Sequence, residues 1–174
     1  MLILLGQSTD KPLKLETRAR MQIDNYTRSG VLAGSERLAR DQAIKKHVLD
    51  VGNVRHGCDA GYNCHGMVFA SRRAWVDRPE TVDQILHEDG YRPVELKDVM
   101  AGDVVVYREV NGDAAHSGIV VEAPIQRGVY VQVMKVWSKW GSGNEVIHPV
   151  TACPYPTERI QYYRPRGTEH DDSI

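Results

Sequence analysis

The sequence predicts an α+β domain, with helices in its first part and an antiparallel sheet in its second. Apolar residues recur at three- and four-residue spacing in the stretches 64–75 and 81–89, which is typical of a buried helix face. After residue 103, β-branched and aromatic residues gather in short runs separated by Gly, Pro or Asn. Segregated helices and strands are typical of α+β folds. A chain of 174 residues suits one domain with its own hydrophobic core.

Three helices are expected in the first part. One runs from Ser35 to about Val51 and has an imperfect apolar face. The next begins at residue 64, where Asn63 supplies a side chain suited to the N-cap position. The third covers 81–89 and ends at a glycine.

About five strands are expected to form the sheet. They are the runs 104–110, 116–123, 129–137, 145–148 and 160–164. The turn before the first strand contains Gly102 and Asp103, and we expect the Asp103 carboxylate to hold that turn through backbone hydrogen bonds.

Charge and composition exclude several classes of partner. The 22 basic and 23 acidic residues give a net charge of -1, so neither nucleic acid nor a membrane is expected as a partner. The apolar run at residues 1–5 is too short for a signal peptide, and no run is long enough to cross a bilayer. We expect a protein made in the cytoplasm, with non-classical export as the open alternative.

Cys64 is the candidate nucleophile. At a helix start, unpaired backbone N–H groups and the helix dipole favour a thiolate. A nucleophilic thiol needs a base that takes its proton and returns it to the leaving group. His116, at the start of a β-prone run, is the candidate base.

The order of these features resembles the NlpC/P60 superfamily of papain-like cysteine hydrolases, to which the CHAP amidases are related. The resemblance spans roughly residues 62–164, although His65 follows the cysteine where the family usually has a small residue. The sequence resembles one group of NlpC/P60-like proteins more closely, because it shares further motifs with them. Their equivalents here are Asn63-Cys64, His116-Ser117, Ser138-Lys139-Trp140-Gly141 with His148, and Tyr162-Tyr163-Arg164.

The resemblance implies a papain-like fold, with N-terminal helices packed on the sheet, and a cysteine peptidase or amidase that needs no cofactor. It divides the chain into an extension at 1–52, a catalytic core at 53–165 and a tail at 166–174 that we expect to be disordered. Expected substrates are a peptide, a peptidoglycan peptide or a protein, as for a cell-wall enzyme or a toxin-like effector. Acyl transfer by a deamidase or transglutaminase is included.

The family also has a third polar residue that orients the imidazole. A turn at 124–128 is expected to bring residues 135–138 beside His116, and a second turn to bring His148 beside Ser138. His148 is therefore our first choice for the third residue, and Ser138 is the second.

The remaining site residues are candidates for the cleft. The backbone N–H of Cys64 is expected to bind the oxyanion together with the Asn63 side chain or the Tyr62 hydroxyl. His65 is a candidate for the cleft wall. Trp137 and Trp140 either line the cleft or fill the core.

Two other interpretations stay open. One is a non-catalytic binding module on the same fold. The other is a zinc site or a disulfide between Cys58 and Cys64, although a gap of five residues is unlike a zinc knuckle and three cysteines leave at least one free thiol. The zinc ligands would come from His56, Cys58, Cys64, His65 and Cys153. No metal is expected.

Overall fold

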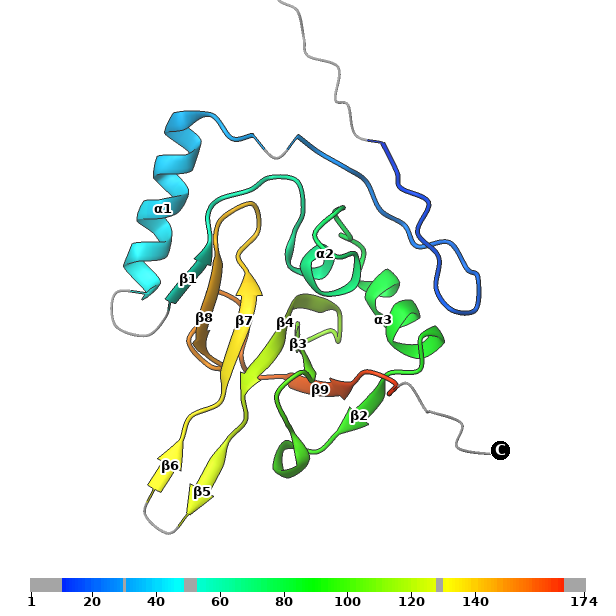
Figure 1. The fold of residues 1–174 in the computed structure, drawn as a ribbon, viewed down its shortest axis with the longest axis vertical. Helices are drawn as coiled ribbons and strands as arrows, with labels where there is room; N and C mark the ends of the chain where they lie inside the picture. The colour runs from blue at the N-terminus through cyan, green and yellow to red at the C-terminus, as the bar shows by residue number, and fades with distance from the viewer. Residues whose placement is uncertain (1–10, 30, 49–52, 128–129, 168–174) are drawn as a thin grey trace, which may run out of the picture.

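A computed structural model describes residues 11–29, 31–48, 53–127 and 130–167 (Figure 1). Most of the predicted tail, the last residues of the first predicted helix and residue 129 lie outside these ranges. Within them the fold is mixed α and β, with few helices and one large antiparallel sheet, which confirms the predicted mixture of helices and antiparallel sheet.

Seven strands form the sheet in the order β1-β8-β7-β4-β3-β9-β2. They are β1 (Asn53–His56), β2 (Arg92–Val94), β3 (Val104–Arg108), β4 (Ala114–Glu122), β7 (Lys135–Lys139), β8 (Glu145–Pro149) and β9 (Ile160–Arg164). The predicted number of about five was too low. It omitted β1 and β2, which are short edge strands with no buried residue and therefore no alternating apolar pattern.

The predicted strand 129–137 is divided in two. Its first part belongs to a separate two-stranded ribbon of β5 (Ile125–Arg127) and β6 (Tyr130–Gln132), which projects from the sheet in Figure 1. Its second part is β7, which pairs with β4 and β8 inside the sheet.

The helices are α1 (Gly34–Val48), α2 (Cys64–Phe69) and α3 (Pro79–Glu88), and a 3-10 turn, η1 (Leu96–Asp98), precedes β3. The prediction that α2 extends to residue 75 was wrong. Ser71 and Arg72 have φ angles of 49° and 63°, and such left-handed residues cannot continue a right-handed helix.

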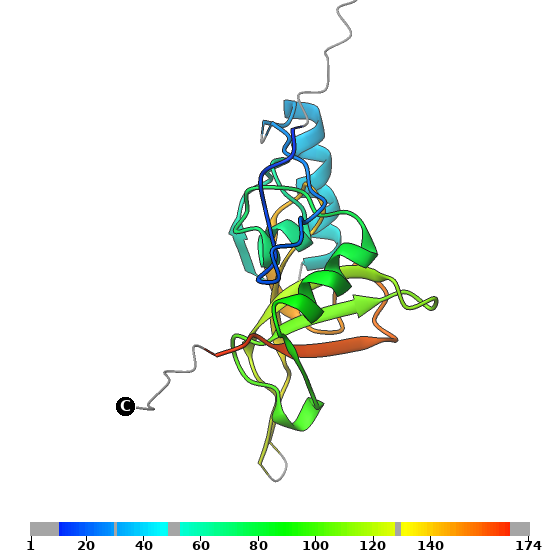
Figure 2. The same ribbon diagram turned by 90° about the vertical axis from the view of Figure 1, so that its right-hand side faces the viewer.

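Helices α2 and α3 pack against β4, whereas α1 lies beside β1 and β8 (Figures 1 and 2). The predicted apolar face of α3 is buried against β3, where Val82 and Ile85 share a core with Val104 and Val106. On the opposite sheet face, Tyr107 packs in a second core with residues of β7 and the segment after β8. Each face of the central strands is therefore covered.

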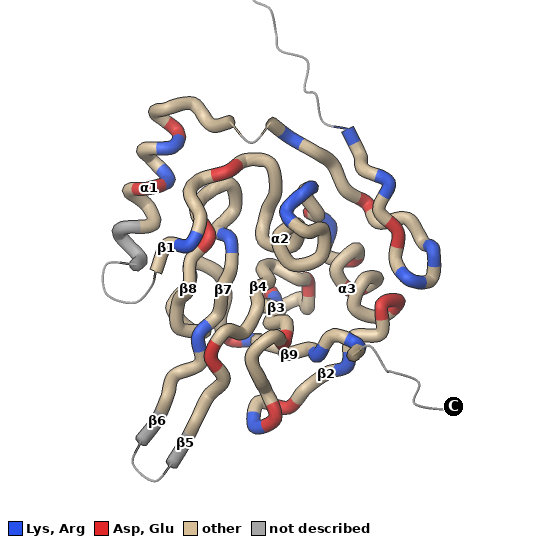
Figure 3. Tube along the Cα trace, in the orientation of Figure 1, with Lys and Arg blue, Asp and Glu red and all other residues tan. Residues whose placement is uncertain are grey.

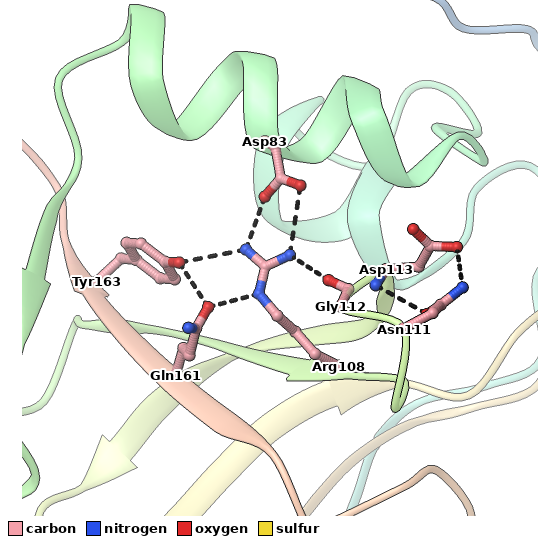
Figure 4. Close-up of polar contacts among 7 residues, drawn as sticks. All are labelled: Asp83, Arg108, Asn111, Gly112, Asp113, Gln161 and Tyr163. Atoms are coloured by element: carbon pink, nitrogen blue, oxygen red, sulfur yellow. Dashed lines mark hydrogen bonds and ion pairs between the residues drawn. The ribbon is translucent and has the colours of Figure 1, made fainter.

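Arg108, at the end of β3, ties α3 to the sheet (Figure 4). Its guanidinium donates to the Asp83 carboxylate at 2.6 Å, to the Gly112 carbonyl at 2.9 Å and to the Tyr163 hydroxyl at 3.2 Å, as well as to Gln161. These partners come from α3, β9 and the turn before β4. They fix the start of the strand that carries His116.

Basic and acidic residues are interspersed along the described part of the chain trace (Figure 3). Asp103 holds its turn as predicted, because its carboxylate accepts from the Met100 N–H at 2.9 Å and also pairs with Arg164. Among the described residues, no helix combines the length and apolar character that a membrane span requires.

Candidate active site

Asn63 caps α2 as predicted and is fully occupied in doing so. Its side-chain oxygen accepts from the backbone N–H groups of Gly66 at 2.8 Å and Val76 at 3.2 Å. Its amide group donates to the Val76 carbonyl at 2.8 Å and to Asp77 at 2.9 Å. Both amide hydrogens are used, so the structure gives Asn63 a positioning role and leaves no hydrogen for the oxyanion contact expected of it.

Gly66 lets the chain fold tightly around the start of α2. A Cβ atom at this position would lie 1.8 Å from the carbonyl oxygen of Ala74. Any side chain would therefore push the returning segment away from the helix. Together with the Asn63 cap, this packing fixes where Cys64 lies.

Cys64 is buried, with 5% of its surface exposed. Burial raises the pKa of the Cys64 thiol to about 11, although hydrogen bonds from the backbone amides of Ser117, His65 and Cys64 itself act in the opposite direction. Burial thus outweighs the helix start, and the closed site holds a neutral thiol rather than the expected thiolate.

His116 is fully buried on β4, and neither of its ring nitrogens has a hydrogen-bond partner among the described residues. Its ring stacks on Tyr155, with a centroid distance of 3.8 Å and an angle of 5°. Burial first, and then the fields of His65 and His148, hold the pKa of His116 well below 6.5, so the imidazole is neutral.

Two observations place Cys64 near the part of β4 that carries His116. The backbone amide that faces the sulfur belongs to Ser117, the neighbour of His116. Tyr155 stacks on His116 and also senses the charge of Cys64, which contributes to a raised pKa of the Tyr155 hydroxyl. Both predicted catalytic residues therefore lie near the same part of β4 and near Tyr155, and of the two it is His116 that stacks on the Tyr155 ring.

His148 and Ser138 bind each other, as the position of the second turn predicted. Ser138 Oγ lies 2.8 Å from His148 Nε2 and accepts from Trp140 Nε1 at 3.2 Å. The other His148 nitrogen, Nδ1, lies 2.8 Å from the carbonyl oxygen of Pro149. Both imidazole nitrogens are occupied, and His148 acts on His116 through its charge rather than through a hydrogen bond.

The prediction that residues 135–138 lie beside His116 was wrong, because the register between β4 and β7 differs from it by at least two residues. Ser138 pairs with Gly118 and not with His116. The pairing contains an irregularity between Val120 and Glu122, and the β5–β6 ribbon lengthens the connection. Counting residues from a single turn could not include either feature.

The other predicted cleft residues are held inside the protein. His65 is 3% exposed and its Nδ1 lies 2.9 Å from Ser117 Oγ, and burial lowers the pKa of His65 to about 4. Tyr62 donates to Glu145 at 2.7 Å. Trp140 packs in a core with α1. Trp137 is half-buried, and the guanidinium carbon of Arg72 lies 4.8 Å from the centroid of the Trp137 ring.

Sequence reasoning missed a buried charged cluster at the end of the β7–β8 hairpin. Glu145, 1% exposed, pairs with Arg72 at 2.6 Å and accepts from Tyr62. Lys139 is fully buried over the Tyr62 ring at 4.6 Å and donates to the Gly143 carbonyl, and burial lowers the pKa of Lys139 to about 8. The alternating pattern at 145–148 identified a strand, but it gave no sign that its first residue is a buried carboxylate.

Tyr155 was also missed, because it lies in the irregular segment between β8 and β9, where no periodicity marks it. All three cysteines are free thiols, so the alternative disulfide between Cys58 and Cys64 is not formed. In the described part of the chain, no three His, Cys, Asp or Glu side chains are grouped to hold a metal ion.

Comparisons with protein-family models, curated proteins and solved structures found no match for this chain. What can be said of its chemistry therefore rests on the residues of this site.

Proposed function

We propose that this protein is a papain-like cysteine hydrolase of the NlpC/P60 type that cleaves an amide bond through an acyl-enzyme. Cys64 is the nucleophile and His116 is the base. The observation that carries the proposal is the buried imidazole of His116, which has no hydrogen-bond partner for either nitrogen among the described residues and is next in the chain to Ser117, whose backbone amide faces the Cys64 sulfur.

An unpaired buried polar group is costly, by about 1–3 kcal/mol. The neighbouring buried histidines avoid this cost, since His65 is bound to Ser117 and His148 to Ser138. An apolar residue at position 116 would avoid it too. A buried polar group left unpaired is expected at functional sites, because residues there can be retained for catalysis although they lower stability.

The neutral resting pair suits general-base catalysis. As the Cys64 sulfur attacks the carbonyl carbon, His116 takes the thiol proton and the carbonyl oxygen becomes an oxyanion. The backbone N–H groups of Cys64 and Ser117 are the donors we assign to that oxyanion. His116 then returns the proton to the leaving amine, and water releases the acyl group.

We assign His148 as the third residue of the catalytic set. Its hydrogen bond to Ser138 fixes which of its ring nitrogens carries the proton. Burial lowers the pKa of His148 and so keeps it neutral, while its hydrogen bonds to Ser138 and Pro149 fix its orientation. A proton on His148 would disfavour a proton on His116. Substrates that fit the proposal are a peptide, including a peptidoglycan peptide, or the side-chain amide of a protein.

The test is iodoacetamide labelling of each cysteine between pH 4 and 10. Because the resting thiol is neutral, we expect Cys64 to label by way of proton transfer to His116, and His116→Ala to slow that labelling by about 100-fold. His87→Ala, which changes an exposed histidine on α3, is the matched control. Cys58 and Cys153 serve as internal references.

The rival is a non-catalytic binding module, and the burial of both Cys64 and His116 favours it. It requires that Cys64 label no faster than Cys58 and Cys153, and that His116→Ala change nothing. That result would remove the hydrolase proposal.

A further inference from the structure

A cavity of about 240 Å³ lies beside the candidate active site, between α1 and the turn that joins β7 to β8. Its walls include Arg40, Ala43, Ile44, Trp140, Pro154 and Tyr155. The volume is below the range of about 300–1,000 Å³ that is typical of sites for whole small molecules. The cavity therefore suits one group of a larger ligand.

Tyr155 separates this cavity from the catalytic pair. Its ring lines the cavity and also stacks on His116 at 3.8 Å. The backbone of Gly141, which also lines the cavity, hydrogen-bonds to the Tyr155 hydroxyl. A group in the cavity would thus lie one aromatic ring away from the imidazole.

Most of the cavity wall is apolar. Ile44 and Trp140 are 5% and 7% exposed and belong to one core cluster. Gly143 keeps the space open, because a Cβ atom there would lie 2.8 Å from the Trp140 carbonyl oxygen and 3.4 Å from the end of Ile44. Such a surface favours an aliphatic or aromatic group.

Among the described residues that line this wall, Arg40 is the one that carries a charge. One nitrogen of its guanidinium pairs with Glu36 at 3.2 Å on the helix surface. Its Nε is buried and has no hydrogen-bond partner among the described residues. The charge of Arg40 reaches both Tyr155 and Lys139. The Arg40 side chain is nevertheless 40% exposed, so a ligand oxygen in the cavity can reach its guanidinium.

We propose that this cavity is a binding subsite for an apolar group that carries a carboxylate. The carboxylate binds Arg40, and the apolar group packs against Ile44 and Trp140. The role of the subsite rests on the proposed function: the bound group is part of the amide substrate, and Tyr155 turns aside to bring the scissile carbonyl to Cys64.

The test uses 3-phenylpropionate and its uncharged partner 3-phenylpropionamide as probes, titrated by NMR into the intact Cys64→Ser protein. We expect saturable binding, with the carboxylate bound about tenfold more tightly than the amide. Arg40→Gln should remove this preference, whereas Arg37→Gln, an exposed change on the same helix, should keep it. Ala43→Phe should fill the cavity and abolish binding, and Ala39→Phe, at an exposed position, should not.

The subsite is refuted if neither probe binds, or if Arg40→Gln and Ala43→Phe bind as the parent does. This experiment needs no reactive thiol, so the two proposals fail separately. A reactive Cys64 with no probe binding removes the subsite alone. Probe binding with an unreactive Cys64 leaves the subsite and removes the hydrolase.

Discussion

Two buried polar groups on the same sheet differ in how their atoms are paired. On β8, the Glu145 carboxylate is bound by Arg72 and Tyr62. On β4, His116 is equally buried, yet neither nitrogen has a partner among the described residues. The first arrangement contributes to stability. The second costs stability, and the comparison therefore separates the residues that hold the site from the residue to which we assign its chemistry.

The paired group also explains how the cysteine is held. Tyr62 precedes α2 and Arg72 follows it, and both bind Glu145. One carboxylate thus anchors the chain on each side of the short helix that begins with Cys64. The four predictions below test this contrast, from the largest expected effect to the smallest.

The largest expected effect is destabilisation of the protein by acid, through its buried histidines. Burial lowers the pKa of His65 to about 4 and also lowers the pKa of His116 and His148, whereas unfolded histidines titrate near 6.5. As pH falls below 6.5, the unfolded chain binds more protons, so stability present at neutral pH is lost. We expect the free energy of unfolding to fall by about 3 kcal/mol or more between pH 7.5 and 5.

Urea denaturation at the two pH values measures this loss. The exposed His87 provides a control, because His87→Gln should leave the pH dependence unchanged. Stopping at pH 5 keeps most carboxylates ionised. Equal stability at both values would mean that the buried histidines accept protons within the fold.

Removing the paired carboxylate should cost nearly as much. Glu145→Ala leaves Arg72 and the buried Lys139 without their anion, and we expect the free energy of unfolding to fall by about 3 kcal/mol. The matched control is Glu122→Ala, which breaks a half-exposed pair with Lys135 and should cost less than about 1 kcal/mol. If chemical denaturation gave the two variants the same loss, the Glu145 cluster would not be a stabilising anchor.

Opening the cover should expose the thiol. Tyr155→Ala removes the ring stacked on His116, and we expect Cys64 to label at least about tenfold faster with iodoacetamide, which corresponds to about 1.4 kcal/mol. Cys58, which contacts Asn144 away from this ring, should label at an unchanged rate. An unchanged rate at Cys64 would show that another element closes the site.

Replacing the unpaired imidazole should stabilise the protein. His116→Leu removes two unsatisfied polar atoms, and we expect a gain of about 1 kcal/mol in the free energy of unfolding at pH 7.5. The same variant should label at Cys64 about 100-fold more slowly than the wild type, as expected for His116→Ala. A loss of stability of 2 kcal/mol or more would instead mean that the imidazole is paired in solution, and the contrast with Glu145 would disappear.

Local patterns in the sequence were sufficient for much of the fold. The Asn63 cap, the apolar face of α3 and the five central strands all depend on residues close together in the chain, and the structure contains each of them. The edge strands β1 and β2 were missed because exposed strands have no alternating apolar pattern.

The site was harder to predict, since it depends on contacts between distant segments. Cys64 and His116 were found from their local settings, and the Ser138–His148 contact from turn positions. The Glu145 cluster joins residues up to 83 positions apart, and the Tyr155 stack arises from an irregular segment. Nor could the high thiol pKa be predicted, because burial of Cys64 is a property of the folded chain.

The amide that faces the sulfur belongs to the main chain of Ser117. Nineteen of the twenty amino acids supply the same N–H, and only proline removes it. Most substitutions of Ser117 would therefore remove the hydroxyl that contacts His65 and keep the amide. A mutational scan without proline would report only the effect of losing the side chain. Among single substitutions at this position, Ser117→Pro is therefore the one that removes the amide and would test the oxyanion role we propose for it.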